Sequence, residues 1–127
     1  MKIRFYLLSF LCVAVMTAGI LGCAKKADPN KPIQQIQTEV QKMSLGELES
    51  NARAYANEIV SKKSEVGKVA DQVKAISIKE LLSQKAKDLK SQLSKLQSDL
   101  SAYAERYQIY AQKFQQLGGD VAKIKVQ

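Results

Sequence analysis

The chain of 127 residues contains no histidine and no tryptophan, and it has only two cysteines and two prolines. The absence of histidine excludes histidine-based acid–base catalysis and the commonest zinc ligand. A glycine-rich phosphate-binding loop is also absent. The carboxylates, such as Glu47, Glu58 and Asp71, lie among lysines at helix-surface spacing, which is typical of solvated charges. We therefore expect no enzymatic activity, no cofactor and no metal site.

The first 22 residues have the composition of an export signal. Lys2 and Arg4 precede any acidic residue, and residues 5–21 carry no charge. This uncharged run of 17 residues is shorter than the roughly 20 that a membrane-spanning helix needs. A basic start, an apolar middle and a small-residue end are typical of a secretory signal peptide, here residues 1–22. An uncleaved membrane anchor is the alternative.

The signal ends in Ile20-Leu21-Gly22-Cys23, which resembles the lipobox of bacterial lipoproteins. The resemblance covers residues 1–23. It implies that Cys23 receives a diacylglyceryl group, that a dedicated peptidase cuts before this residue, and that the new amino group is acylated, as palmitate labelling would reveal. It also implies a lipid-anchored protein of the bacterial cell envelope. Ala24, and not aspartate, follows the cysteine, which in enteric-type bacteria implies the outer membrane, facing the periplasm.

Processing at Cys23 would leave residues 23–127 as the mature chain, enough for one domain. This chain would contain no disulfide and no free thiol, because Cys12 lies in the signal. The formal net charge of +8 falls to +6 when Lys2 and Arg4 leave. An exported protein whose lysines alternate with acids is a poor candidate for nucleic-acid binding. Anionic lipid, lipopolysaccharide or cell-wall polymer is a reasonable partner for such charge, and a merely lysine-rich surface is the alternative.

Start and stop signals divide the mature chain into segments. Residues 23–31 are polar and interrupted by proline, which predicts a lipidated tether. Ser44 with Glu47 forms one capping box, and Ser77 forms a second with the glutamate three residues later. The pair at residues 118–119 is a glycine stop signal. These signals predict helices over 32–75 and 78–117 with a kink near 44, a helical hairpin over 32–119, and a flexible tail over 120–127.

Both predicted helices carry an apolar stripe with alternating steps of three and four residues. The first stripe is Leu45, Leu48, Ala52, Tyr55, Ile59, Lys62, Val66, Val69, Val73 and Ile76. The second is Leu82, Ala86, Leu89, Leu93, Leu96, Leu100, Tyr103, Tyr107, Tyr110, Phe114 and Leu117. Such sustained heptads are typical of coiled-coil packing, and the stripes are out of phase with each other, which favours a turn between them over one continuous rod.

We therefore predict an all-α fold: an antiparallel, coiled-coil-like helical hairpin with a short extra N-terminal helix. A register in which Ile59 faces Leu96 brings every stripe position of one helix against a stripe position of the other. It also places Tyr110 opposite Leu45, and the polar stripe residue Lys62 opposite Leu93. Two thin hairpins pairing as a homodimer, in a four-helix bundle, are compatible with this pattern.

The aromatic residues Tyr103, Tyr107, Tyr110 and Phe114 are the most distinctive feature of the second stripe. Their stripe positions favour a role in the core. The alternative is a binding groove for a peptide, lipid or glycan at the membrane-proximal end, because tyrosine hydroxyls need a polar partner or water.

Three functions fit these observations. The first is a non-enzymatic, lipid-anchored spacer or docking rod for an envelope protein that the sequence does not identify. The second is a ligand- or polymer-binding lipoprotein that uses the tyrosine-rich end. The third is a wall-linked protein resembling the murein lipoprotein. That resemblance fails twice, because this chain ends in Lys125-Val126-Gln127 without a terminal lysine and its heptads break phase.

Overall fold

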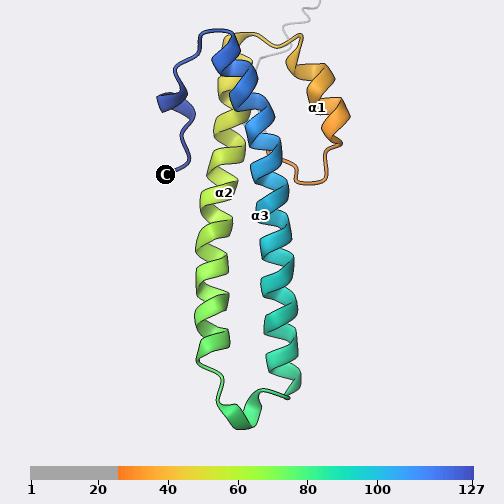
Figure 1. Ribbon diagram of the computed structural model, residues 1–127, viewed down its shortest axis with the longest axis vertical. Helices are drawn as coiled ribbons and strands as arrows, with labels where there is room; N and C mark the ends of the chain where they lie inside the picture. The colour runs from red at the N-terminus through yellow and green to blue at the C-terminus, as the bar shows by residue number, and fades with distance from the viewer. Residues whose placement is uncertain (1–25) are drawn as a thin grey trace, which may run out of the picture.

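The computed structural model describes residues 26–127, and this part of the chain folds into an antiparallel helical hairpin (Figure 1). Helix α2 (Leu45–Lys74) and helix α3 (Gln84–Gln116) form its two arms. A shorter helix, α1 (Ile33–Val40), precedes them. No strand occurs among the described residues, and the predicted all-α hairpin with an extra N-terminal helix is confirmed.

Helix α2 begins at the first capping box. The Ser44 hydroxyl accepts a hydrogen bond from the Glu47 backbone N–H (3.3 Å), and the Glu47 carboxylate accepts one from the Ser44 N–H (2.9 Å). These bonds satisfy backbone donors that the first helical turn would otherwise leave unpaired. Helix α1 ends just before this point, so the break between the two helices lies where the sequence predicts a kink.

The connection between the arms differs from the predicted start of the second helix at Ile78. A 3-10 helix, η1 (Ile78–Glu80), lies there instead, and α3 begins only after Ser83. The Ser77 hydroxyl donates to the Glu80 carboxylate (3.2 Å) and accepts no capping hydrogen bond from the backbone of η1. The Ser83 hydroxyl accepts from a backbone N–H of the first α3 turn (3.2 Å). Since Ser83 supplies the cap, the helix starts later than predicted.

The later start of α3 changes the pairing of side chains along the hairpin. Tyr55 of α2 stacks on Tyr110 of α3, with ring centroids 5.5 Å apart, and meets Tyr103 edge-on at 6.1 Å. The sequence prediction placed Tyr110 opposite Leu45, but Leu45 is 40% exposed. The predicted register is therefore wrong in its residue pairs, although most buried residues of both arms come from the predicted stripes.

Helix α3 ends at the predicted glycine stop signal. Gly118 has a φ of +83°, in the left-handed region. The Gly118 N–H donates to the Gln115 carbonyl and the Gly119 N–H to the Phe114 carbonyl, both at 2.9 Å. This pair of bonds is a Schellman motif, which satisfies carbonyls that the last helical turn leaves unpaired.

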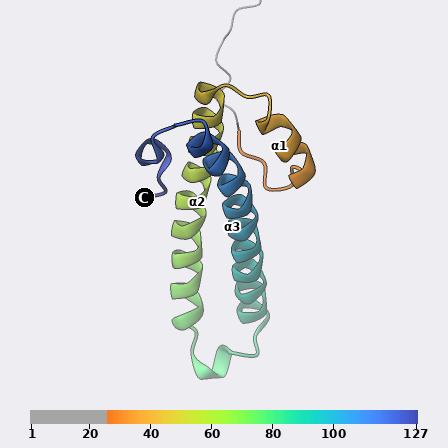
Figure 2. The ribbon, with the colours of Figure 1, turned by 45° about the horizontal axis from the view of Figure 1, so that its top comes forward.

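The hydrophobic core lies at the end of the hairpin where α2 begins and α3 ends. Helix α1 lies beside α3 at this end, and the C-terminal tail lies on the other side of the hairpin, as both views show (Figures 1 and 2). The buried apolar cluster comprises Ala27, Ile36, Val40, Leu48, Ala52, Tyr55, Ile59, Tyr103, Tyr110, Phe114 and Ile124. In the described chain, the further half of the hairpin adds only Val69, Ala86 and Leu96 to the buried apolar residues. That half is a bare pair of helices.

The C-terminal tail is ordered against the hairpin, whereas the sequence suggested a flexible segment over 120–127. Residues Val121–Ile124 form the 3-10 helix η2, and the Asp120 side chain accepts a hydrogen bond from a backbone N–H inside it (3.0 Å). Ile124 is only 1% exposed, and its carbonyl accepts a hydrogen bond from the Tyr107 hydroxyl (2.8 Å). One buried isoleucine and one tyrosine hydroxyl thus dock the tail, a contact that leaves no periodic pattern in the sequence.

Candidate functional site

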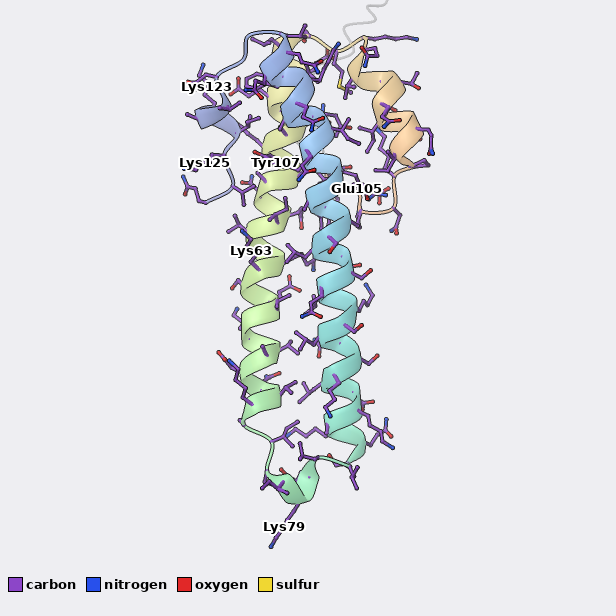
Figure 3. The ribbon with its side chains drawn as sticks, viewed as in Figure 1. Lys63, Lys79, Glu105, Tyr107, Lys123 and Lys125 are labelled. Atoms are coloured by element: carbon purple, nitrogen blue, oxygen red, sulfur yellow. The ribbon has the colours of Figure 1, made fainter. Side chains whose placement is uncertain are left out.

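The aromatic residues that the sequence singles out belong to the core. Tyr103, Tyr110 and Phe114 are exposed by 7%, 1% and 1%. Tyr107 is partly buried, lies on α3 on the side of the tail, and bonds to it through its hydroxyl (Figure 3). Loss of water around the phenols raises the pKa of Tyr103, Tyr107 and Tyr110. Because protein already covers these rings, a ligand would have to displace part of the fold to reach them.

One of the covering elements is residues 26–32, which we call the N-terminal strap. Ala27 in this strap is 5% exposed. The Asp28 N–H donates to the Tyr55 hydroxyl (3.3 Å), and the same hydroxyl donates to the Asp28 carbonyl (3.0 Å). The Lys31 ammonium forms an ion pair with the Glu39 carboxylate of α1. The sequence suggested a tether here, but from Ala27 onward the segment is part of the folded domain.

Arg106 holds the other end of the strap and was not singled out in the sequence. Its guanidinium Nε donates to the Lys31 carbonyl (2.9 Å) and its Nη1 to the Ala102 carbonyl (2.9 Å). The residue is only 9% exposed. Its spacing could have indicated that it is buried. Arg106 is three residues after Tyr103 and four before Tyr110, so it shares their helix face.

The proposed lipid attachment residue Cys23 and the signal segment 1–22 lie outside the described residues. Cys23 precedes the buried Ala27 by four positions, so about 14 Å of extended chain is the most that separates the two residues. A lipid on Cys23 would therefore hold the core end of the hairpin close to its membrane. Between residues 26 and 127, none of the helices is both long enough and apolar enough to span a bilayer.

A shallow basic groove of about 360 Å³ opens between α2 and the tail. Its lining comprises Arg53, Ala56, Asn57, Val60, Lys123, Ile124, Lys125 and Gln127. The Arg53 guanidinium pairs with the Glu49 carboxylate (2.8 Å). Lys123 and Lys125 lie on the exposed tail, and Lys63 lies further along the same side of the hairpin (Figure 3). None of the buried polar side chains of the described chain lines this groove, so it offers diffuse positive charge and no fixed binding group.

The most exposed apolar surface lies at the opposite end of the molecule, in the turn between the arms. We call residues 75–83 the tip. Ile78 and Leu82 are 88% and 87% exposed, and Leu81 is 41% exposed. Lys79 extends away from the hairpin between them (Figure 3). Large apolar side chains so fully in water mark an interaction surface when they are grouped, and this group lies far from the folded core.

The charged residues of the arms form surface ion pairs at helical spacing. Asp71 lies 3.6 Å from Lys74, Glu65 pairs with Lys62 at 3.0 Å, and Asp99 pairs with a lysine at 2.8 Å. Lys62 is thus a partly exposed lysine whose charge reaches a neighbouring carboxylate along the helix. Across residues 26–127, no group of three or more histidine, cysteine or acidic side chains is arranged to hold a metal ion.

Comparison with known proteins adds no relative: no family model, no curated protein and no solved structure matches the chain. The geometry of the described residues therefore carries the functional argument. Two features stand out, a well-packed end that includes the strap and a bare, apolar tip at the other end.

Proposed function

We propose that this protein is a non-enzymatic, lipid-anchored component of the bacterial envelope that acts as a spacer or docking rod. A lipid on Cys23 attaches the core end to the membrane, and the tip meets another envelope component. The observation that carries the proposal is that the strap packs on the core half of the hairpin, whereas the tip is the turn at the far end (Figure 1). Helix α3, with 33 residues, gives the rod a length of about 50 Å.

The anchor rests on the lipobox resemblance of residues 20–23 and on the strap. Because the strap is bonded to Tyr55 and Arg106, little slack separates Cys23 from the rod. A short connection suits a spacer, since it transmits the position of the membrane to the rod. Ala24 after the cysteine favours the outer membrane, facing the periplasm.

The alternative, a receptor that binds a ligand at its tyrosine-rich end, has less support. Tyr103, Tyr110 and Phe114 are buried, and the Tyr107 hydroxyl is engaged with the tail. We therefore assign the aromatic cluster to the stability of the core end and place the docking surface at the tip.

Metabolic labelling with a palmitate analogue tests the anchor. The wild-type protein should carry the label, and Cys23→Ser should lose it and accumulate at the precursor mass. Cys12→Ser is the matched control, because it removes the other cysteine of the leading segment. It should remain labelled. Equal labelling of the Cys23→Ser protein and the wild type, or an unlabelled wild type, would overturn the lipoprotein assignment.

A further inference from the structure

The tip has the chemistry of a lipid-binding element. We propose that it binds the surface of a second, anionic bilayer, with Ile78, Leu81 and Leu82 in the interfacial region and neighbouring lysines on lipid phosphates. This inference rests on the proposed function, because the docking end of the rod is the part that it explains. The occupant of the docking surface is then a membrane, and the protein bridges two lipid surfaces.

The apolar part of the tip suits insertion into an interface. Ile78 and Leu82 have almost all of their surface in water, and Leu81 is 41% exposed. Part of the backbone at this point is bonded within the turn: the Glu80 N–H donates to the Ser77 carbonyl and the Ser83 N–H to the Glu80 carbonyl, both at 2.9 Å. Each N–H group that is already bonded lowers the cost of moving the turn out of water. The tip can therefore bring its side chains into the interface while keeping its fold.

The charge around the tip matches an anionic surface. Residues 68–90 carry six lysines against three acidic residues, a net charge of +3. All nine side chains belong to exposed residues: Lys68, Lys74, Lys79, Lys85, Lys87, Lys90, Asp71, Glu80 and Asp88. Glu80 bonds to Ser77, and Asp88 bonds to Gln84 along the helix. Lysines that flank an exposed apolar group are the pattern by which peripheral elements bind anionic lipid.

The small apolar area of the tip favours a bilayer over a protein as its binding partner. A stable protein interface buries about 800 Å² on each partner, with a shape that the partner complements. Three apolar side chains on a turn do not supply such an area, and the arms behind them are ringed with exposed lysines on both helices. A lipid interface needs no complementary shape and attracts cations on every side of the inserted group.

The geometry separates this bilayer from the one that holds Cys23. The strap packs on the core half of the hairpin, and the tip is the turn at the far end (Figures 1 and 2). An α3 arm of 33 residues spans about 50 Å, so an upright rod keeps the tip out of reach of its own membrane.

A vesicle-bridging experiment tests the inference with the full chain. The acylated protein is incorporated into vesicles of phosphatidylcholine, and protein-free vesicles carrying a second dye are added. One set of these contains phosphatidylcholine alone, and the other also contains phosphatidylglycerol. Two-colour fluorescence then counts the particles that contain both dyes. We expect the wild type to capture the anionic vesicles, and capture to fall as salt rises.

The number of anionic vesicles captured by the Ile78→Ser/Leu82→Ser variant should be lower than that of the wild type by a factor of roughly ten or more. Leu117→Ser/Val121→Ser is the matched control, because these residues are 49% and 47% exposed at the core end. The control should capture as many vesicles as the wild type. Circular dichroism of the same proteins shows that the variants keep their helices, so a loss of capture reports on the tip.

Equal capture by the tip variant and the wild type would overturn the inference. Clustering that occurs only when both vesicle populations carry protein would also overturn it and would assign the tip to contact between copies of the chain. Because the bridging experiment uses the acylated protein, palmitate labelling is established first. An unlabelled wild type would contradict the lipoprotein assignment, and a labelled protein that fails to bridge would contradict the tip assignment alone.

Discussion

Tyr55 joins three parts of the protein with one side chain. Its ring stacks on Tyr110 and meets Tyr103 edge-on, and its hydroxyl exchanges hydrogen bonds with the backbone of Asp28. The ring therefore contributes to packing between the arms, while the hydroxyl holds the strap. Since the two roles use different atoms, substitution can separate them.

Tyr55→Phe keeps the ring and removes both hydrogen bonds to Asp28. The free energy of unfolding should fall by about 1 kcal/mol, since one typical hydrogen bond contributes about that amount. Urea titration followed by circular dichroism measures the change. Tyr103→Phe is the matched control, because the Tyr103 hydroxyl has no hydrogen-bond partner among the described residues. A Tyr103→Phe protein as unstable as Tyr55→Phe would show that the strap contact contributes nothing of its own.

Alkaline pH should destabilise the same region. Burial raises the pKa of Tyr55 and Tyr110 above the value of about 10 for an exposed tyrosine. The pKa of Lys31 is also raised: burial lowers it, but its hydrogen bond to Glu39 and nearby negative charge outweigh that effect. A pKa that is raised in the folded state contributes stability that is present below the unfolded pKa and is lost as pH rises through the folded one.

We therefore expect the free energy of unfolding to be constant near pH 8 and to fall steadily above about pH 10. Urea titrations at a series of pH values give the curve, and tyrosinate absorbance follows the ionisation. Stability that stays level or rises above pH 10 would contradict the burial of these phenols.

At the scale of the elements, the glycines show how helix boundaries depend on local contacts. A Cβ atom at Gly119 would lie 2.5 Å from the ring of Phe114, which is 1% exposed, so it could be accommodated only by a shift within the packed core. A Cβ atom at Gly67, in the exposed middle of α2, would meet nothing within 4 Å. The same substitution should thus have opposite effects at the two positions.

Gly119→Ala should lower the free energy of unfolding by roughly 1–3 kcal/mol, because the ring of Phe114 must shift in a packed core. Gly67→Ala should raise it by roughly 0.5–1 kcal/mol, because alanine favours the helix interior. Thermal unfolding followed by circular dichroism gives the melting temperature of both proteins. A Gly119→Ala protein that melts at the wild-type temperature would show that the Schellman turn does not pack on Phe114.

The elements also show which features a sequence reveals. Ser44 with Glu47 and the Gly118 stop were readable because caps use short, local patterns. The second capping box predicted the wrong start for α3, because Ser77 bonds to the Glu80 side chain and Ser83 caps the helix instead. Both residues are serines in a similar setting, and only the path of the turn decides between them.

The strap and the tail left no readable signal. Their contacts are single bonds to distant residues, such as the one from Arg106 to Lys31, across 75 positions, and the one from Tyr107 to Ile124. Neither segment has an apolar period of its own. The same holds for the candidate site. The sequence predicted the aromatic cluster, but it did not predict that the strap and the tail pack over it.

At the scale of the whole molecule, the two ends of the hairpin differ in their packing. At the core end, α1, the strap and the tail pack against the two arms, whereas the further half holds only Val69, Ala86 and Leu96 as buried apolar residues of the described chain. The stripes predicted the hairpin itself, because their phase break required a turn. They did not predict the register, because the start of α3 depends on Ser83. A homodimer that covers the thin half is compatible with this asymmetry and remains a proposal.

In the proposed arrangement, one end of the rod is held at the membrane and the tip stands away from it. Energy transfer to an acceptor dye on the lipid headgroups measures this height directly. A donor dye is attached to the acylated protein through Lys123→Cys at the core end, Lys63→Cys along the rod or Lys79→Cys at the tip, all of which are exposed (Figure 3). The vesicles contain phosphatidylcholine only, so that anionic lipid does not attract the tip.

We expect transfer to be strongest from position 123, intermediate from position 63 and weakest from position 79. The spread follows from a rod of about 50 Å, which is close to the range over which such transfer changes steeply. Equal transfer from all three positions would mean that the hairpin lies flat on the bilayer, and it would contradict the spacer function.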